Sequence, residues 1–248
     1  VGYAAGNAMT TGTFNVVVGG EAGDALTTGA ATTVLGAQAL SAEDTGNHNT
    51  AIGNQALKVQ DGGSGNTALG RQAGLAVSTG DNNTIIGTNA GDALTTGSNN
   101  IIIGQNAAAA TVSVGNEIVI GANATGNGSN KITIGDGNIN AFHCQVQTLS
   151  ALSDERDKKD IKNSTYGLEY LESLRPVTFE WDQRDGNRKG LKDLGFIAQE
   201  MQSKDDEYTR LVESNDPEKL QASYGRLIPI LVKAIQDLSE EVKALKNK

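Results

Sequence analysis

The stretch that decides the fold is Gly80-Asp81-Asn82-Asn83-Thr84-Ile85-Ile86-Gly87-Thr88-Asn89-Ala90. A polar corner leads into a short β-branched apolar run, and a glycine ends that run. β-Branched residues favour extended backbone, whereas glycine suits a turn or a place where another backbone comes close. The stretch therefore predicts one short strand between two corners.

The same pattern repeats along the first half of the chain. The glycines that follow the apolar residue are 17 residues apart six times, and the last interval is 14 residues. These pairs are Val18-Gly19, Leu35-Gly36, Ile52-Gly53, Leu69-Gly70, Ile86-Gly87, Ile103-Gly104, Ile120-Gly121 and Ile134-Gly135. Further columns of alanine, glycine and asparagine keep the same phase. Chance does not hold four columns in phase, so this region is a repeat array.

Each 17-residue unit is predicted to form one rung of a β-solenoid or β-roll. Helical repeats are excluded, because units this rich in glycine and asparagine cannot support amphipathic helices. The alternative, a disordered glycine-rich linker, conflicts with apolar columns that stay in phase. Each rung carries few apolar side chains, so stacked rungs and several chains packed side by side must supply the core. We therefore expect an oligomer.

Composition changes sharply at residue 153. Residues 1–152 contain 26 of the 31 glycines and 12 charged side chains, whereas residues 153–248 contain 37 charged side chains and all three prolines. We expect a solenoid over 1–137, a stem over 138–152 and a second domain over 153–248. Because the sequence starts at Val1 without an initiator methionine, we expect it to be part of a longer protein.

Charge and motif content exclude several classes of function. The net charge of −9 argues against nucleic-acid binding, which needs a basic surface. We expect no membrane insertion, because no apolar run is long enough to span a bilayer. The single Cys144 excludes an intrachain disulfide, and neither His48 nor His143 has a partner at metal-ligand spacing. We expect no metal and no cofactor.

The second domain is predicted to be α+β. Leu168, Leu171 and Leu174 predict a short helix that ends before Pro176. Residues 177–181 alternate like a half-buried strand, and residues 194–198 predict a second strand that leads into a helix at residue 199.

The last segment predicts a coiled-coil helix of three heptads. Its apolar residues recur every seven positions in two columns, with Pro229 in the first turn or at a kink. The columns are Ile228, Ile235 and Val242, and Leu231, Leu238 and Leu245. β-Branched residues in the first column with leucine in the second favour two parallel strands when taken alone.

Four motifs in residues 153–248 together resemble one known family. They are Ser153-Asp154-x-Arg156-x-Lys158, Leu174-Arg175-Pro176-Val177-x-Phe179-x-Trp181, Leu194-Gly195-Phe196-Ile197-Ala198-Gln199-Glu200 and the run from Tyr224 to Ile235. The family is the endosialidase-type intramolecular chaperone, a self-cleaving serine peptidase at the C-termini of phage tail fibres and tailspikes. The resemblance implies a homotrimer on the virion.

The resemblance also implies roles for individual residues. Ser153 would attack the carbonyl of Leu152, Lys158 would carry the proton, and Asp154 and Arg156 would orient the loop. Such an enzyme acts only on its own chain, and the C-terminal domain is then released or retained without a covalent link. Lys159 is the alternative base. In the other interpretation Ser153 is the N-cap of a charged helix, and its lysines are a solvated face.

The apolar-glycine rungs are also similar to the head repeats of trimeric autotransporter adhesins, which implies a trimer. The favoured function is a phage fibre fragment that binds a host surface receptor, a glycan or an outer-membrane component. A bacterial adhesin head is the alternative. A polysaccharide-degrading spike would need paired carboxylates on the array. The acidic residues there are sparse and lie mostly in expected corners: Glu21, Asp24, Glu43, Asp44, Asp61, Asp81, Asp92 and Glu117.

Overall fold

The computed structural model describes residues 1–139, 143, 153–184, 188–214 and 220–247. The chain forms two compact units, Val1–Asn140 and Ala141–Lys248. Most of the expected stem over 138–152 lies outside the described residues, and so do Cys144 and Leu152.

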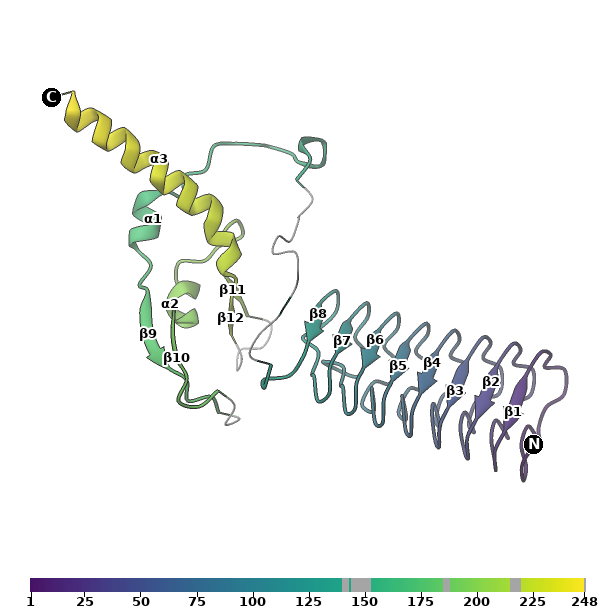
Figure 1. The fold of residues 1–248 in the computed structure, drawn as a ribbon. Helices are drawn as coiled ribbons and strands as arrows, with labels where there is room; N and C mark the ends of the chain where they lie inside the picture. Colours follow the sequence, from purple (N-terminus) through teal and green to yellow (C-terminus); the bar gives the residue numbers. More distant parts are fainter. Residues whose placement is uncertain (140–142, 144–152, 185–187, 215–219, 248) are drawn as a thin grey trace. The chain divides into compact units, whose positions relative to one another are not determined.

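The first unit is a β-solenoid, as the repeats predict. Eight three-residue strands pair in sequence order into one parallel sheet, seen stacked along the unit in Figure 1. Neighbouring strands pair without a register slip, for example Ile85 with Ile102. The strands are β1 (Val16–Val18), β2 (Thr33–Leu35), β3 (Thr50–Ile52), β4 (Thr67–Leu69), β5 (Thr84–Ile86), β6 (Ile101–Ile103), β7 (Ile118–Ile120) and β8 (Ile132–Ile134).

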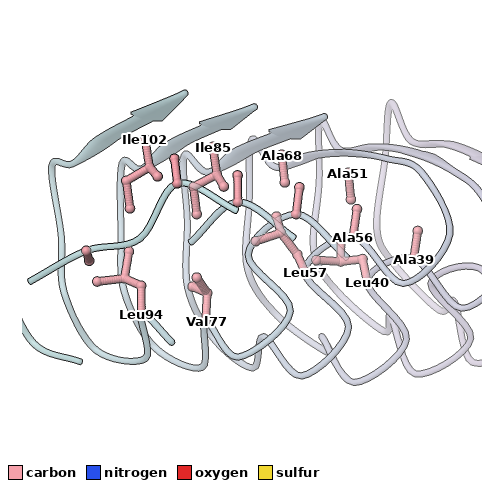
Figure 2. Packing of buried hydrophobic residues seen from close by; sticks show 14 of the residues in the cluster. Ala39, Leu40, Ala51, Ala56, Leu57, Ala68, Val77, Ile85, Leu94 and Ile102 are labelled. Atoms are coloured by element: carbon pink, nitrogen blue, oxygen red, sulfur yellow. The ribbon is translucent and has the colours of Figure 1, made fainter. Parts of the chain in front are cut away.

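The core of the solenoid is a narrow column of aliphatic side chains. The middle residue of each strand points inward, and Ile85 and Ile102 are fully buried. Figure 2 shows that Val77 and Leu94 approach them from the opposite wall. Alanine fills the tighter positions, such as Ala51 and Ala68. Each rung therefore closes its core with only a few small or branched side chains.

The glycine after each strand is required by both backbone angle and space. Gly87 has φ +132°, a region that side-chain-bearing residues rarely adopt. A Cβ added there would lie 2.5 Å from the carbonyl oxygen of Gly104 in the next rung. A Cβ added at Gly70 would lie 2.6 Å from the carbonyl oxygen of Gly87. The glycine column therefore lets consecutive turns stack.

A buried ladder of asparagines connects consecutive rungs. Asn49, Asn66, Asn83 and Asn100 are all fully buried. The Asn66 Oδ1 atom accepts a hydrogen bond from the backbone N–H of Asn83 at 2.9 Å, and its Nδ2 donates to the Gly80 carbonyl at 2.7 Å. Because a buried polar backbone group without a partner is costly, the ladder satisfies groups at the corners that the sheet cannot reach.

Two of the acidic residues in the array are buried. Glu43 and Glu117 have no exposed surface. Glu117 occupies the next position of the asparagine column, and its carboxylate accepts the N–H groups of Ala110 and Gly128. Glu43 accepts those of Thr45, Gly46 and Gly62. Backbone N–H groups thus replace the water that a carboxylate would lose on burial.

The second unit has an α+β fold, as predicted. The antiparallel pair β9 (Val177–Glu180) and β10 (Lys192–Gly195) and the pair β11 (Val212–Glu213) and β12 (Gln221–Ala222) form two small sheets. The helices are α1 (Leu168–Glu172), α2 (Ala198–Gln202) and α3 (Leu227–Lys246), with 3-10 turns at Glu155–Asp157 and Tyr224–Arg226. The sequence did not predict β11 and β12, which are too short to leave a periodic signal.

Helix α3 packs one face against the rest of the second unit, and the two heptad columns lie on its exposed side. Leu227, Ile230 and Ala234 are buried, and the Asp237 carboxylate accepts the backbone N–H of Leu168 at 3.1 Å. The heptad residues stay exposed in the single chain, with Ile235 at 66% and Leu238 at 50%. Pro229 lies in the first turn, where its missing N–H costs no helical bond. Among the described helices, none is long and apolar enough to cross a bilayer.

Candidate active site

A tight turn at the start of the second unit brings Ser153 and Lys158 together. Residues Glu155–Asp157 form one 3-10 turn, and the N–H of Lys158 donates to the Glu155 carbonyl at 3.0 Å. The backbone at Lys158 is extended, so the chain leaves the turn there. A turn that folds back over five residues returns the lysine side chain to the serine.

The two side chains are in direct hydrogen-bond contact. Lys158 Nζ lies 2.7 Å from Ser153 Oγ and 3.0 Å from the Ser153 carbonyl oxygen. Within the described part of the chain, Lys158 and not Lys159 is the lysine that reaches the serine hydroxyl. A serine becomes a nucleophile when an adjacent base takes its proton, and this separation suits that transfer.

Asp154 and Arg156 hold the turn between these two residues. The Asp154 carboxylate accepts the Arg156 backbone N–H at 2.9 Å, and it pairs with the guanidinium through Nε at 3.0 Å and Nη2 at 2.6 Å. The side-chain hydrogen bond from Arg156 lowers the pKa of Asp154, and the same contact raises the pKa of Arg156. Both groups therefore stay charged at neutral pH.

The interpretation of Ser153 as a helix N-cap does not fit this geometry. The residue that caps the turn is Asp154, and the turn is a three-residue 3-10 segment rather than a charged helix. Ser153, Lys158 and Lys159 are all exposed in the single chain, so they belong to the surface of the second unit. The other side of the bond before Ser153 is Leu152, which lies outside the described residues.

The three downstream motifs meet in one small core. Arg175 of the first pairs with Glu200 of the second through two hydrogen bonds, at 3.0 Å and 2.5 Å. Phe196 packs edge to face on Tyr224 of the third motif, with ring centres 5.7 Å apart. Leu174, Met201, Leu211, Leu227 and Ile230 form the buried centre. Motifs that are far apart in sequence therefore pack together in one folded unit.

The comparisons with known proteins bear on this half of the chain. Residues 153–209 match the family model described as "Chaperone of endosialidase". The match confirms the resemblance drawn from the motifs, and it begins at Ser153 itself. The motif at Tyr224–Ile235 lies beyond the matched residues. The family is associated with self-cleaving activity.

Two curated relatives are phage proteins. The chain is 32% identical over 92 residues to "Long tail fiber protein Gp37" of Enterobacteria phage M1 and, with the same figures, to the protein of that name from Enterobacteria phage Ox2. The matched region covers 37% of this chain and 36% of each relative. The chain therefore matches about a third of the length of these relatives. No solved structure matches the chain.

The solenoid brings one set of acidic residues together. Carboxylate oxygens of Glu43, Asp44 and Asp61 lie within 4.8 Å of one another. The negative charge of Asp44 raises the pKa of Asp61. The buried Glu43 is already committed to backbone N–H groups and to the Gln60 amide at 3.1 Å. Glu43 in this cluster therefore serves backbone and amide groups of the solenoid.

Proposed function

We propose that this chain is part of a trimeric phage tail fibre whose C-terminal segment aligns three chains and then cuts itself off before Ser153. The contact of 2.7 Å between Lys158 Nζ and Ser153 Oγ, at the residue where the family match begins, carries this proposal. The tail-fibre relatives support the fibre and a location on the virion. They favour this function over the alternative of a bacterial adhesin head.

The cleavage chemistry uses only the chain itself and one water molecule. Ser153 Oγ attacks the Leu152 carbonyl carbon while the Lys158 amine takes the hydroxyl proton. The C–N bond to Ser153 breaks, Lys158 returns the proton to the leaving nitrogen, and an ester joins Leu152 to Ser153 Oγ. Water then hydrolyses the ester, which leaves a carboxylate at Leu152 and a free amine at Ser153. Asp154 and Arg156 keep the turn in the geometry that this step needs.

An alignment step explains why such a fibre would carry a removable segment. Packing three solenoids side by side requires the chains to be aligned first, and contacts that depend on such an alignment form slowly. The exposed heptad columns of α3 can associate early, because a helix is a local structure. Three helices in register would then hold three solenoids side by side. After release the segment cannot act in refolding, so the mature fibre would be kinetically trapped.

The attachment function concerns the solenoid. The corners of the rungs carry the charged and amide side chains, so they offer the groups that a glycan or an outer-membrane component would contact. We propose that the host receptor binds there. The C-terminal segment is then released or stays bound without a covalent link.

Mass spectrometry of the denatured protein tests the proposed cleavage. Wild-type protein should give two fragments, with Ser153 as the new N-terminus. Lys158→Ala should leave the chain whole or cleave it far more slowly, because the hydroxyl loses its base. Lys159→Ala is the matched control and should cleave normally. Equal cleavage of the Lys158 and Lys159 variants would overturn the dyad.

A further inference from the structure

The outward face of the solenoid sheet carries an unbroken row of aliphatic side chains. It consists of the third residue of every strand, and we call it the aliphatic stripe. Its members are Val18, Leu35, Ile52, Leu69, Ile86, Ile103, Ile120 and Ile134. One member lies on each rung, so the stripe follows the whole sheet drawn in Figure 1.

The stripe is partly exposed in the single chain: its members on β2, β4, β7 and β8 are exposed, and those on β1, β3, β5 and β6 are partly buried. Leu35 is 48% exposed, Leu69 is 45% exposed and Ile134 is 54% exposed, whereas their inward neighbours Val34 and Ala68 are fully buried. Side chains alternate between the two faces of a strand, so the stripe cannot reach the core of its own rung. Single exposed leucines are ordinary on protein surfaces, but a contiguous row of them marks a contact surface.

Charge identifies the kind of partner that this face can accept. Each of the 12 charged side chains in residues 1–137 lies outside strands β1–β8. The chain as a whole has a net charge of −9, so two copies repel one another through most of their surfaces. The sheet face is the place where a second copy can approach without facing a like charge.

Spacing gives a second reason to expect another copy. Paired parallel strands are about 4.8 Å apart, so the stripe is a regular row with that repeat. The register holds from β1 to β8, including the shorter last rung. Another solenoid of this chain presents the same row with the same repeat. Two such rows can meet rung for rung, which an irregular partner surface cannot do.

We propose that the aliphatic stripe is the contact between copies of this chain, with the solenoids parallel and equivalent rungs in register around one rotation axis. This inference rests on the proposed trimer and names the face that forms it. Equivalent stripe residues of different copies then lie close together. The neighbouring column includes Thr67 and Thr84, which are half-buried and border the contact.

Cysteine cross-linking on the chain of residues 1–248 tests the proposed face. Leu69→Cys is made in a Cys144→Ala background and treated with a short bismaleimide. Thr79→Cys is the matched control, because Thr79 is exposed and lies two residues from Val77 on the opposite wall. We expect cross-linked chains on a denaturing gel for position 69 and at least tenfold less product for position 79. Leu35→Cys repeats the test two rungs away.

The possible results separate this inference from the function on which it rests. A trimer by light scattering that cross-links at 79 but not at 69 or 35 would overturn the stripe as the interface, and the proposed fibre would stand. A protein that cleaves before Ser153 but is monomeric would overturn both the trimer and the stripe contact. Cross-links between positions 35 and 69 in a mixed sample would overturn the in-register arrangement.

Discussion

Asn83 joins its own rung to the rung of Asn100 through its side-chain amide. Its Oδ1 atom accepts the backbone N–H of Asn100 at 3.0 Å, and its Nδ2 donates to the Gly97 carbonyl at 2.9 Å. Both asparagines are fully buried. The amide therefore takes the place of water for two backbone groups that the sheet leaves without partners.

Replacing Asn83 with alanine should destabilise the solenoid strongly. The change leaves the Asn100 N–H and the Gly97 carbonyl buried without a partner, at roughly 1–3 kcal/mol each. Urea unfolding of the full chain, with hydrogen exchange at β5 and β6, measures the effect. Thr79→Ala, an exposed polar side chain, should change the free energy of unfolding by less than about 0.5 kcal/mol. Equal effects of the two variants would show that the ladder contributes little.

A methyl group at Gly87 should be poorly tolerated. Gly87→Ala places a Cβ 2.5 Å from the Gly104 carbonyl at φ +132°. The strained angle alone costs about 1–3 kcal/mol, and the clash adds to it. Gly20→Ala is the control, because a Cβ at that position meets no atom within 4 Å. Thermal unfolding should separate the two variants clearly, and a normal melting temperature for Gly87→Ala would contradict the stacking argument.

The solenoid could be predicted well because its residue pattern repeats from rung to rung. One glycine column and one apolar column fix the rungs, since each position must satisfy the same close approach in every turn. The burial of Glu43 and Glu117 could not be predicted, because charged residues normally remain in water and some of their N–H partners, Gly62 and Gly128, are distant in sequence. The asparagine column was visible in the sequence. Its burial was not, because asparagine also suits exposed corners.

The pair Ser153 and Lys158 was inferred from the family resemblance, and the structure places their side chains in contact. Their role in cleavage stays a prediction. The pairing of Arg175 with Glu200 joins residues 25 positions apart, and spacing alone could not reveal it.

A hydrogen bond between Tyr166 and Asp206 should make the second unit sensitive to pH at both extremes. The phenol donates to the carboxylate at 2.5 Å, which raises the pKa of Tyr166 to about 12 and lowers that of Asp206 to about 2. Its stabilisation should be lost as pH rises from about 10 to 12, and again as pH falls from about 4 to 2. Tyr166→Phe should lower the melting temperature between those two pH ranges, and it should weaken the dependence of the melting temperature on pH within each range. If that pH dependence is unchanged in the variant, the Tyr166–Asp206 pair is not its source.

Charges in the heptad columns should prevent assembly without unfolding the chain. Ile235→Asp with Leu238→Asp alters side chains that are exposed in the single chain, so the second unit should remain folded. In a trimer the same positions would bury six carboxylates, which is strongly unfavourable. Light scattering should therefore find monomers or aggregated solenoid. Gln236→Asp is the control for added charge on an exposed position of α3 and should leave a trimer. A soluble trimer from the double variant would show that these columns are dispensable.

The measurement that tests the central claim most directly is the intact mass of the Ser153→Ala protein beside wild type, both denatured before analysis. The substitution removes the Oγ atom that Lys158 contacts at 2.7 Å and little else. We predict that wild type separates into a fragment ending at Leu152 and one beginning at Ser153, whereas the variant keeps its full mass and still forms a trimer. Cleavage that persists in Ser153→Ala, or a new N-terminus at any other residue, would contradict the assignment of Ser153 as the nucleophile.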